Sequence, residues 1–186
     1  MRNLSEFIAV YDDALDAQLC DDMVANFHSL KQFQARNGAG VREGLEDSGW
    51  TEMNVTALAD IGFKRHFEGQ LLKFFARYNA EIHLSLPLSP LTKVSDLMLK
   101  HYRAESRDRF QLHFDSIRAH SNRYLVFLWY LNDVAEGGET VFPDLDVSVK
   151  PKKGRLLMFP PYWQYQHAGL SPKSGDKYIV SAYALY

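Results

Sequence analysis

Short apolar runs separated by turn residues divide the second half of the chain, and this pattern limits the folds that it can adopt. The runs are rich in β-branched and aromatic residues, and they are Val94–Tyr102, Arg123–Leu131, Val147–Val149, Arg155–Phe159 and Tyr178–Tyr186. Turn signals such as Gly137–Gly138 and Ser171–Gly175 stand between them. Strands spaced this closely favour antiparallel pairing in a sandwich or barrel. We therefore expect a β-rich core in this half.

The first half of the chain has helical periodicity instead. From Asp16 to about Phe33, apolar residues recur at helical spacing behind a capping aspartate, and Thr56–Tyr78 repeats the pattern. With 186 residues, of which 46% are hydrophobic, the chain is long enough for one domain and short for two. We expect a single α+β, mainly β domain over the whole chain, with residues 1–90 as helical support and residues 91–186 as the core.

Two segments of the first half lack helical spacing. Phe7–Tyr11 is a short apolar run, which predicts an opening strand. Arg36–Gly49 contains four glycines and charges of both signs without a period, so we expect a loop. This loop is either a surface connection or a mobile lid over a site.

Charge and hydropathy argue against several classes of function. The net charge of −2 gives no electrostatic reason to expect nucleic acid or an anionic membrane as a partner. No run approaches the ~20 apolar residues of a membrane helix, and Met1–Val10 has no signal-peptide character. The single cysteine, Cys20, is expected to be a buried thiol in a helix. These features predict a cytoplasmic protein.

Three side chains of the β-rich half could hold a metal ion. His113 and Asp115 are two residues apart, so on a strand they would point to the same face, and His167 lies far downstream. Two imidazoles and one carboxylate can hold Fe(II) on one side of the ion and leave the other positions open. The same donors also suit catalytic zinc, although no His-Glu-x-x-His motif accompanies them.

A lysine follows the second histidine by ten residues. Lys177 begins the last apolar run, where an unpaired ammonium group would be costly to bury. It is therefore either a solvated strand start or the partner of a ligand carboxylate. A dicarboxylate cosubstrate such as 2-oxoglutarate would need such a group at its far end. Together with the three candidate metal ligands, Lys177 indicates an iron-dependent oxygenase.

Several motifs in the second half resemble the prolyl 4-hydroxylase branch of the Fe(II)/2-oxoglutarate dioxygenases. They follow the order and spacing of the family over Leu97–Tyr183, and they are Tyr130–Pro143, Val149–Arg155, Leu156–Phe159 and His167–Gly169 with Lys177. The first half matches the family only in general character.

The resemblance implies a double-stranded β-helix, or jelly-roll, whose iron ligands are His113, Asp115 and His167. It also implies hydroxylation of an unactivated C–H bond with O2, coupled to conversion of 2-oxoglutarate into succinate and CO2. Asp115 occupies the position that halogenating relatives leave open for chloride, which favours hydroxylation. Ascorbate binding is expected from the family alone.

The cosubstrate contacts also follow from the resemblance. Lys177 would bind the C5 carboxylate of 2-oxoglutarate, Tyr130 would donate its hydroxyl to the same carboxylate, and Tyr102 would lie nearby. Leu128 and Tyr183 would line the pocket wall. The three tyrosines could equally be ordinary core aromatics.

The substrate is less constrained. A prolyl residue in a peptide or protein is favoured by the resemblance, and a free amino acid or other small molecule is the alternative. An exposed aromatic groove at Trp163 and Tyr165 would favour a peptide, whereas Arg103 or Arg118 pointing into a closed pocket would favour a free amino acid. Phe110 departs from the family, which often has a tyrosine three residues before the first ligand histidine.

Two further expectations concern binding without catalysis. The basic cluster Lys150, Lys152, Lys153 and Arg155 is expected to be a solvated turn rather than a binding patch. A non-catalytic jelly-roll that senses a metal or a dicarboxylate is the alternative from a different functional class. The intact candidate ligands favour an enzyme over it.

Overall fold

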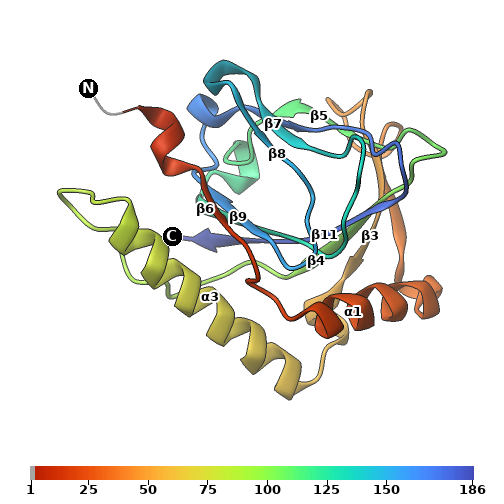
Figure 1. Ribbon diagram of the computed structural model, residues 1–186, viewed down its shortest axis with the longest axis horizontal. Helices are drawn as coiled ribbons and strands as arrows, with labels where there is room; N and C mark the ends of the chain where they lie inside the picture. The colour runs from red at the N-terminus through yellow and green to blue at the C-terminus, as the bar shows by residue number, and fades with distance from the viewer. Residues whose placement is uncertain (1–2) are drawn as a thin grey trace.

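A computed structural model describes residues 3–186. Met1 and Arg2, which belong to the segment expected to lack signal-peptide character, lie outside the described residues. Two β-sheets, of seven and four strands, build the core. Figure 1 shows the helices α1 and α3 beneath the large sheet, on the side away from the small sheet strands β5, β7 and β8. The fold thus has a helical layer, a wide sheet and a smaller sheet.

The seven-stranded sheet is antiparallel throughout, in the order β1-β9-β6-β11-β4-β3-β2. Its strands, in that order, are Ala9–Tyr11, Leu156–Phe159, Arg123–Tyr130, Lys177–Leu185, Met98–Tyr102, Gly49–Asn54 and Ala35–Gly38. The longest strand, β11, pairs with β6 on one side and β4 on the other. It therefore lies at the centre of the sheet.

The four-stranded sheet is also antiparallel, in the order β5-β10-β7-β8. Its strands, in that order, are Phe110–His113, His167–Gly169, Thr140–Phe142 and Val147–Val149. A hydrophobic cluster joins the two sheets, with Phe142 and Val149 from the small sheet packed among Leu128, Leu157 and Phe159 of the large one. Two facing antiparallel sheets with few helices are the predicted mainly β jelly-roll, which is confirmed.

The helices begin at polar caps, and one of these caps corrects the sequence-based expectation. α1 (Ala17–Ser29) begins behind Asp16, whose side chain accepts hydrogen bonds from two backbone amides, as predicted. The helix expected over 56–78 is divided into α2 (Val55–Leu58) and α3 (Ile61–Glu81). The division arises because the Asp60 side chain accepts a hydrogen bond from the Phe63 amide and so caps a new helix. Short 3₁₀ turns lie at Leu4–Phe7, Lys31–Phe33, Arg118–His120, Pro143–Leu145 and Trp163–Tyr165.

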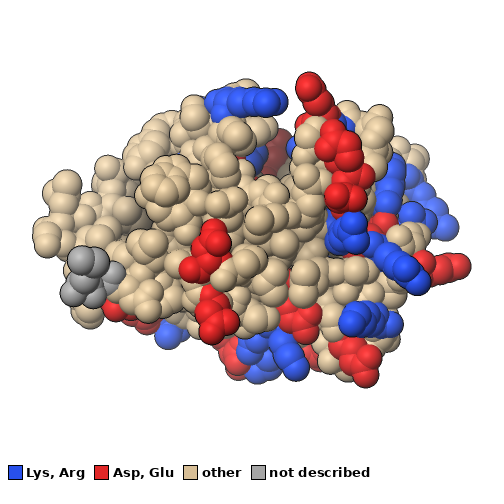
Figure 2. Space-filling model, turned by 90° about the horizontal axis from the view of Figure 1, so that it is seen from above, with Lys and Arg blue, Asp and Glu red and all other residues tan. Residues whose placement is uncertain are grey.

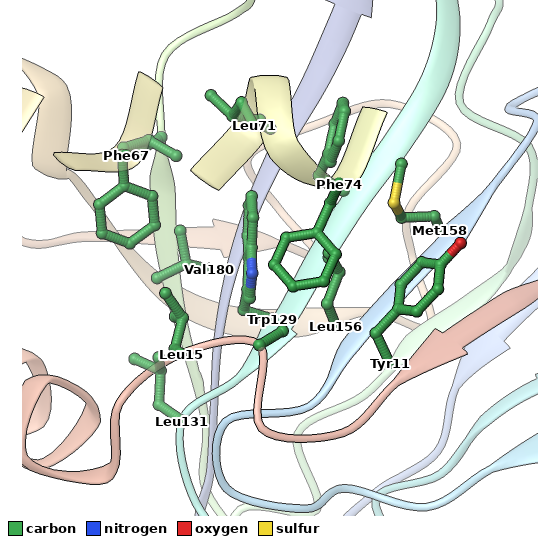
Figure 3. Packing of buried hydrophobic residues seen from close by; sticks show 14 of the residues in the cluster. Tyr11, Leu15, Phe67, Leu71, Phe74, Trp129, Leu131, Leu156, Met158 and Val180 are labelled. Atoms are coloured by element: carbon green, nitrogen blue, oxygen red, sulfur yellow. The ribbon is translucent and has the colours of Figure 1, made fainter. Parts of the chain in front are cut away.

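The main core lies between the helices and the large sheet. Figure 3 shows Phe67, Leu71 and Phe74 of α3 packed over Trp129 of β6 and Val180 of β11. Burying each such side chain contributes roughly 1.5–3 kcal/mol. Because helices cover one face of the sheet and the small sheet covers the other, β6 is apolar on both faces, and all its residues after the first are buried. Cys20 is a free, buried thiol in this core, as expected.

The first half of the chain supplies strands as well as helices. The predicted opening strand is β1, shortened by a 3₁₀ turn that ends at Phe7. The segment 36–49, expected to be a loop, forms part of the hairpin β2–β3, so the connection is only residues 39–48. Gly38 has φ +100°, and a Cβ there would collide with the Ser48 carbonyl. The glycine therefore allows the hairpin to close.

The predicted basic turn is neutralised by the N-terminal segment. Lys152 and Arg155 both form ion pairs with Asp12, at 2.9 and 2.7 Å, and Lys153 pairs with Asp21 of α1 at 2.6 Å. In the face shown in Figure 2, acidic and basic side chains are interspersed. In residues 3–186, no helix has the length and apolar character needed to cross a bilayer.

Candidate metal centre

The small sheet places two histidines opposite each other. His113 is the last residue of β5 and His167 is the first of β10, and they pair directly in the antiparallel register. Opposite side chains on such strands have their Cβ atoms about 5 Å apart. The two imidazole rings accordingly have their centroids 4.3 Å apart.

Asp115 completes a cluster of three. It lies in a bend just beyond β5, and not on the strand as its spacing had suggested; its amide and that of Ser116 both donate to the Pro161 carbonyl at 3.0 Å. The carboxylate oxygens are 3.6 Å from His113 Nε2 and 3.5 Å from His167 Nε2. One potential ligand atom from each residue lies within 4.8 Å of the others.

A backbone carbonyl fixes each histidine. His113 Nδ1 lies 2.8 Å from the Gln111 carbonyl oxygen, and His167 Nδ1 lies 3.0 Å from that of Tyr165. A carbonyl oxygen can only accept, so Nδ1 carries the proton and Nε2 keeps a lone pair on the side of Asp115. Two Nε2 atoms and one carboxylate suit Fe(II).

The protonation states also suit a cation. Burial acts to raise the pKa of Asp115, but the neighbouring imidazoles of His113 and His167 outweigh burial and hold this pKa well below its usual range. Burial, followed by the charge of His113, lowers the pKa of His167 to about 4. At neutral pH the site therefore offers a carboxylate and an uncharged imidazole, the forms that bind metal.

Tyr183 and Arg123 hold the aspartate in place. The Tyr183 hydroxyl donates to Asp115 Oδ1 at 3.0 Å. Arg123 lies over the Tyr183 ring, 3.8 Å from its centroid, with Nη1 4.0 Å from the same carboxylate oxygen. The sequence predicted Tyr183 at the pocket wall but gave no signal for Arg123, which begins an apolar strand.

Aromatic rings pack around the histidines. Phe110 stacks on His113 at 3.7 Å between centroids, and Trp50 stacks on Phe110 at 4.6 Å. Phe159 lies edge-on to His167 at 4.7 Å. Phe110, where the family often has a tyrosine, thus supplies a stacking surface instead of a hydroxyl and helps to exclude water from the site.

A cavity extends from this cluster between the sheets. Its wall includes Leu128 and Tyr183, where the sequence predicted them, together with Phe110, Val126 and Ile179. Lys177 and Tyr102 line the same cavity and pair directly in the register between β11 and β4. The candidate metal ligands and the candidate cosubstrate lysine therefore share one space.

Lys177 is buried, with 2% of its surface exposed, so it is not a solvated strand start. Its Nζ donates to the carbonyls of Gly138 at 2.9 Å and Leu170 at 3.3 Å, and lies 4.6 Å from the centroid of the Tyr102 ring. Burial lowers the pKa of Lys177 to about 7, with Glu139 acting in the opposite direction. No acidic side chain within residues 3–186 forms an ion pair with this ammonium, so it is available to an anion.

Gly138 explains the double glycine of the sequence. It has φ +77°, and a Cβ there would lie 3.3 Å from Pro151 Cγ and 3.4 Å from Lys177 Cδ. This backbone conformation directs the Gly138 carbonyl to Lys177 Nζ. The segment that the sequence identified only as a turn therefore positions the lysine.

Tyr130 and Tyr102 differ from each other in position. Tyr102 lines the cavity, as the resemblance implied. Tyr130 is fully buried and does not reach the cavity wall; its hydroxyl donates to Thr140 Oγ1 at 2.7 Å, and Thr140 lines the cavity instead. Thr140 therefore lies between the Tyr130 hydroxyl and the cavity, and a direct contact of Tyr130 with the C5 carboxylate stays a prediction.

Neither sequence criterion for the substrate is met. Trp163 is 64% exposed, but Tyr165 is buried in the hydrophobic core, so the two form no common groove. Arg103 approaches Asp108, and Arg118 lines an outer hollow rather than the metal cavity. The sequence missed a cation that does line the cavity, Lys100 on β4.

Known proteins with similar sequences relate the second half of the chain to one superfamily. Residues 97–185 match the family model of the 2OG-Fe(II) oxygenase superfamily. This segment belongs to that superfamily. The oxygenase segment is similar to a probable prolyl 4-hydroxylase 11 of Arabidopsis thaliana, with 38% identity over 87 residues that cover 41% of this chain and 29% of the relative. The chain thus spans less than a third of that relative's length.

Several solved structures have a fold similar to that of this chain. A viral collagen prolyl hydroxylase from Paramecium Bursaria Chlorella virus-1, in a 2-oxoglutarate complex, is 22% identical with a TM-score of 0.60, over 95% of this chain and 94% of that one. A Trichoplax adhaerens prolyl hydroxylase bound to a hypoxia inducible factor peptide fragment is 16% identical with a TM-score of 0.75, over 97% and 84%. These likenesses show that the chain shares the fold of solved prolyl hydroxylases.

Proposed function

We propose that this protein is an Fe(II)- and 2-oxoglutarate-dependent dioxygenase that hydroxylates an unactivated C–H bond of a prolyl group. One observation carries this proposal: His113, Asp115, His167 and Lys177 line the same cavity. The three metal-ligand candidates and an ammonium without an acidic partner are what a chelating dicarboxylate would require.

His113, Asp115 and His167 would hold the iron through two Nε2 atoms and a carboxylate oxygen. When bound, the iron with O2 and 2-oxoglutarate supplies the oxidising power for C–H hydroxylation and releases succinate and CO2. The backbone carbonyls of Gln111 and Tyr165 keep both imidazoles in the tautomer that presents Nε2. Tyr183 keeps Asp115 turned toward the histidines.

Lys177 would bind the C5 carboxylate of 2-oxoglutarate. A charge-assisted hydrogen bond of this kind contributes roughly 1.5–3 kcal/mol. The carbonyls of Gly138 and Leu170 already orient Nζ, so little side-chain entropy is lost on binding. Thr140 of β7, on the facing sheet, lines the same cavity and offers a hydroxyl.

The prolyl substrate is supported by the names of the similar proteins, which are prolyl hydroxylases, one of them bound to a peptide fragment. A free amino acid is the second candidate, because Lys100 adds a second cation to the cavity wall. Ascorbate dependence and a cytoplasmic location stay predictions.

The experiment measures succinate formed from 2-oxoglutarate by the purified protein with Fe(II) and O2, alone and with proline-containing peptides and free amino acids. We expect Fe(II)-dependent succinate that increases with one class of additive, and a product heavier by one oxygen atom. Protein shown to hold iron that forms no succinate with any additive would contradict an enzymatic function and favour a binding protein.

A further inference from the structure

Lys100 is a second lysine on the wall of the metal cavity, and the reaction proposed above gives it no role. Side chains alternate along β4, so Lys100 shares the cavity face with Tyr102. In the sheet register, Lys100 lies opposite Glu52 of β3 and Ile179 of β11. It therefore stands in the middle of the sheet and not at an edge.

The ammonium of Lys100 has no protein acceptor in the described part of the chain. Its Nζ lies 5.7 Å from the centroids of both the Trp50 and Phe110 rings, and no hydrogen bond or ion pair of this group is formed. Opposite it, Glu52 already accepts from Asn37 at 2.7 Å and from Trp50 at 2.6 Å. Burial lowers the pKa of Lys100, while Asp115 and Glu52 act in the opposite direction.

Ser181 is an independent sign of a missing ligand. It lies on the same face of β11 as Ile179, lines the cavity and is 3% exposed. Its hydroxyl has no hydrogen-bond partner among residues 3–186. Leaving a buried hydroxyl unpaired costs about 1–3 kcal/mol. Because Ser181 lies opposite Met98, it is a diagonal neighbour of Lys100 on the adjacent strand.

The charges of the loaded cavity leave one positive charge unmatched. Lys100, Lys177 and Fe(II) bring four positive charges, whereas Asp115 and 2-oxoglutarate bring three negative ones. Lys177 and the metal already account for both carboxylates of the cosubstrate. An anionic group on the substrate would restore neutrality, whereas a prolyl residue inside a peptide chain has no charge of its own.

A hollow beside the site is lined by more basic than acidic side chains. This outer hollow shares Phe110, His113 and Asp115 with the cavity. Arg118 and Arg123 line it, and among the described residues its lining contains one further carboxylate, Glu43, besides Asp115; Arg42 also lines it but approaches Glu52 at 3.8 Å. Clefts lined by one sign of charge raise the local concentration of oppositely charged substrates.

We propose that Lys100 and Ser181 form a carboxylate subsite, and that the substrate is a prolyl compound with its own carboxylate free, as in the free imino acid or a C-terminal prolyl residue. This inference rests on the proposed function and narrows its substrate. Lys100 donates to the substrate carboxylate through its ammonium and Ser181 through its hydroxyl, beside the metal ligands.

The test compares carboxylates with their neutral amides. L-proline, L-prolinamide, Gly-Pro and Gly-Pro-amide are titrated by calorimetry into protein loaded with Mn(II) and 2-oxoglutarate, for the wild type, Lys100→Met, Lys100→Arg and Ser181→Ala. Lys93→Met is the matched control, because Lys93 is exposed and the change removes the same charge. Thermal unfolding of each variant checks that it is folded.

We expect the wild type and Lys93→Met to bind at least one carboxylate about 10-fold or more tightly than its amide. Lys100→Met should abolish this preference, Ser181→Ala should reduce it, and Lys100→Arg should preserve it. The affinity for 2-oxoglutarate should be unchanged in Lys100→Met. Whether proline or Gly-Pro shows the preference distinguishes a free imino acid from a C-terminal residue.

Two results would overturn the subsite. One is a wild type without a carboxylate preference, or a preference that survives in Lys100→Met. The other is a Lys100→Met variant that loses affinity for 2-oxoglutarate and keeps the substrate preference, which would assign Lys100 to the cosubstrate. Succinate assays separate the failure of the subsite from the failure of the proposed function. Turnover of internal prolyl peptides and amides would contradict the subsite alone. A protein that forms no Fe(II)-dependent succinate with any additive would contradict the proposed enzyme.

Discussion

The two sheets contribute different chemistry to the cavity. The small sheet supplies both histidines, from strands of four and three residues. The large sheet supplies both lysines of the cavity, Lys100 and Lys177, and the hydroxyls of Tyr102 and Ser181. A chelating dicarboxylate would have to reach from one sheet to the other. Metal binding and carboxylate binding can therefore be disturbed separately, although they meet in one space.

The two sheets also differ in how the side chains that they contribute are oriented. On the small sheet, each histidine is fixed locally, by the carbonyl two residues earlier. On the large sheet, Lys177 is oriented by the carbonyls of Gly138, 39 residues earlier, and Leu170, seven residues earlier. The tautomer of each imidazole therefore depends on short-range structure, whereas the orientation of Lys177 also depends on a segment 39 residues away.

The largest effect should come from removing a candidate metal ligand of the small sheet. His167→Ala removes one of three candidate ligands, so we expect Mn(II) or Fe(II) affinity to fall by more than about 100-fold, since even outer-shell partners of ligands are worth 10–100-fold. Fe(II)-dependent succinate should be lost. His66→Ala is the control, because His66 is an exposed histidine of α3. Full activity of His167→Ala would make the ligand assignment wrong.

Lys177 on the large-sheet side should show itself in the pH dependence of stability. Its pKa is about 7 in the folded protein, below its usual 10.5. Between these values the unfolded chain binds more protons, so the free energy of unfolding should rise with pH across this window. Lys177→Met should reduce that rise in the ligand-free protein, measured by urea unfolding at pH 7 and pH 9.5. Lys100, whose pKa is also lowered, should preserve part of it. If the free energy of unfolding rose with pH as much in Lys177→Met as in the wild type, the lowered pKa of buried Lys177 would be contradicted.

A matched pair of glycines tests how the large-sheet lysine is oriented. Gly138 and Gly40 have φ of +77° and +75°, but a Cβ at Gly40 would meet no atom within 4 Å. Gly40→Ala should cost about 1–2 kcal/mol of stability from the backbone conformation alone. Gly138→Ala should cost more and raise the 2-oxoglutarate requirement, because its Cβ would crowd Pro151 at 3.3 Å and touch Lys177 at 3.4 Å. Equal losses of stability and unchanged 2-oxoglutarate kinetics would contradict this role.

The smallest effect is expected at Tyr130 of the large sheet, whose hydroxyl contacts Thr140 of the small sheet. Tyr130→Phe removes a buried hydrogen bond to Thr140, so unfolding should become easier by about 0.5–1.5 kcal/mol. The KM for 2-oxoglutarate should change little, because Tyr130 does not reach the cavity. A rise in KM of about 10-fold would instead favour the direct contact that the family resemblance implied.

The sequence predicted the candidate metal ligands and Lys177, but it missed Lys100 and Ser181 on the large sheet. Strand positions such as Val147–Val149 and the Asp16 cap followed from local patterns. The hairpin β2–β3 did not, because its residues are polar, glycine-rich and partly exposed, without apolar alternation. Without β3, Lys100 on β4 would be an edge residue facing water. Its place on the cavity wall depends on long-range pairing that no local pattern reveals.

The most direct test of the account asks whether one dicarboxylate contacts both sheets. The affinities of 2-oxoglutarate and of pyruvate, which lacks the distal carboxylate, are measured by calorimetry on Mn(II)-loaded wild type and Lys177→Met. We predict that the wild type prefers 2-oxoglutarate by roughly 10- to 150-fold and that Lys177→Met binds both equally. A preference for 2-oxoglutarate that survives in Lys177→Met would contradict the account.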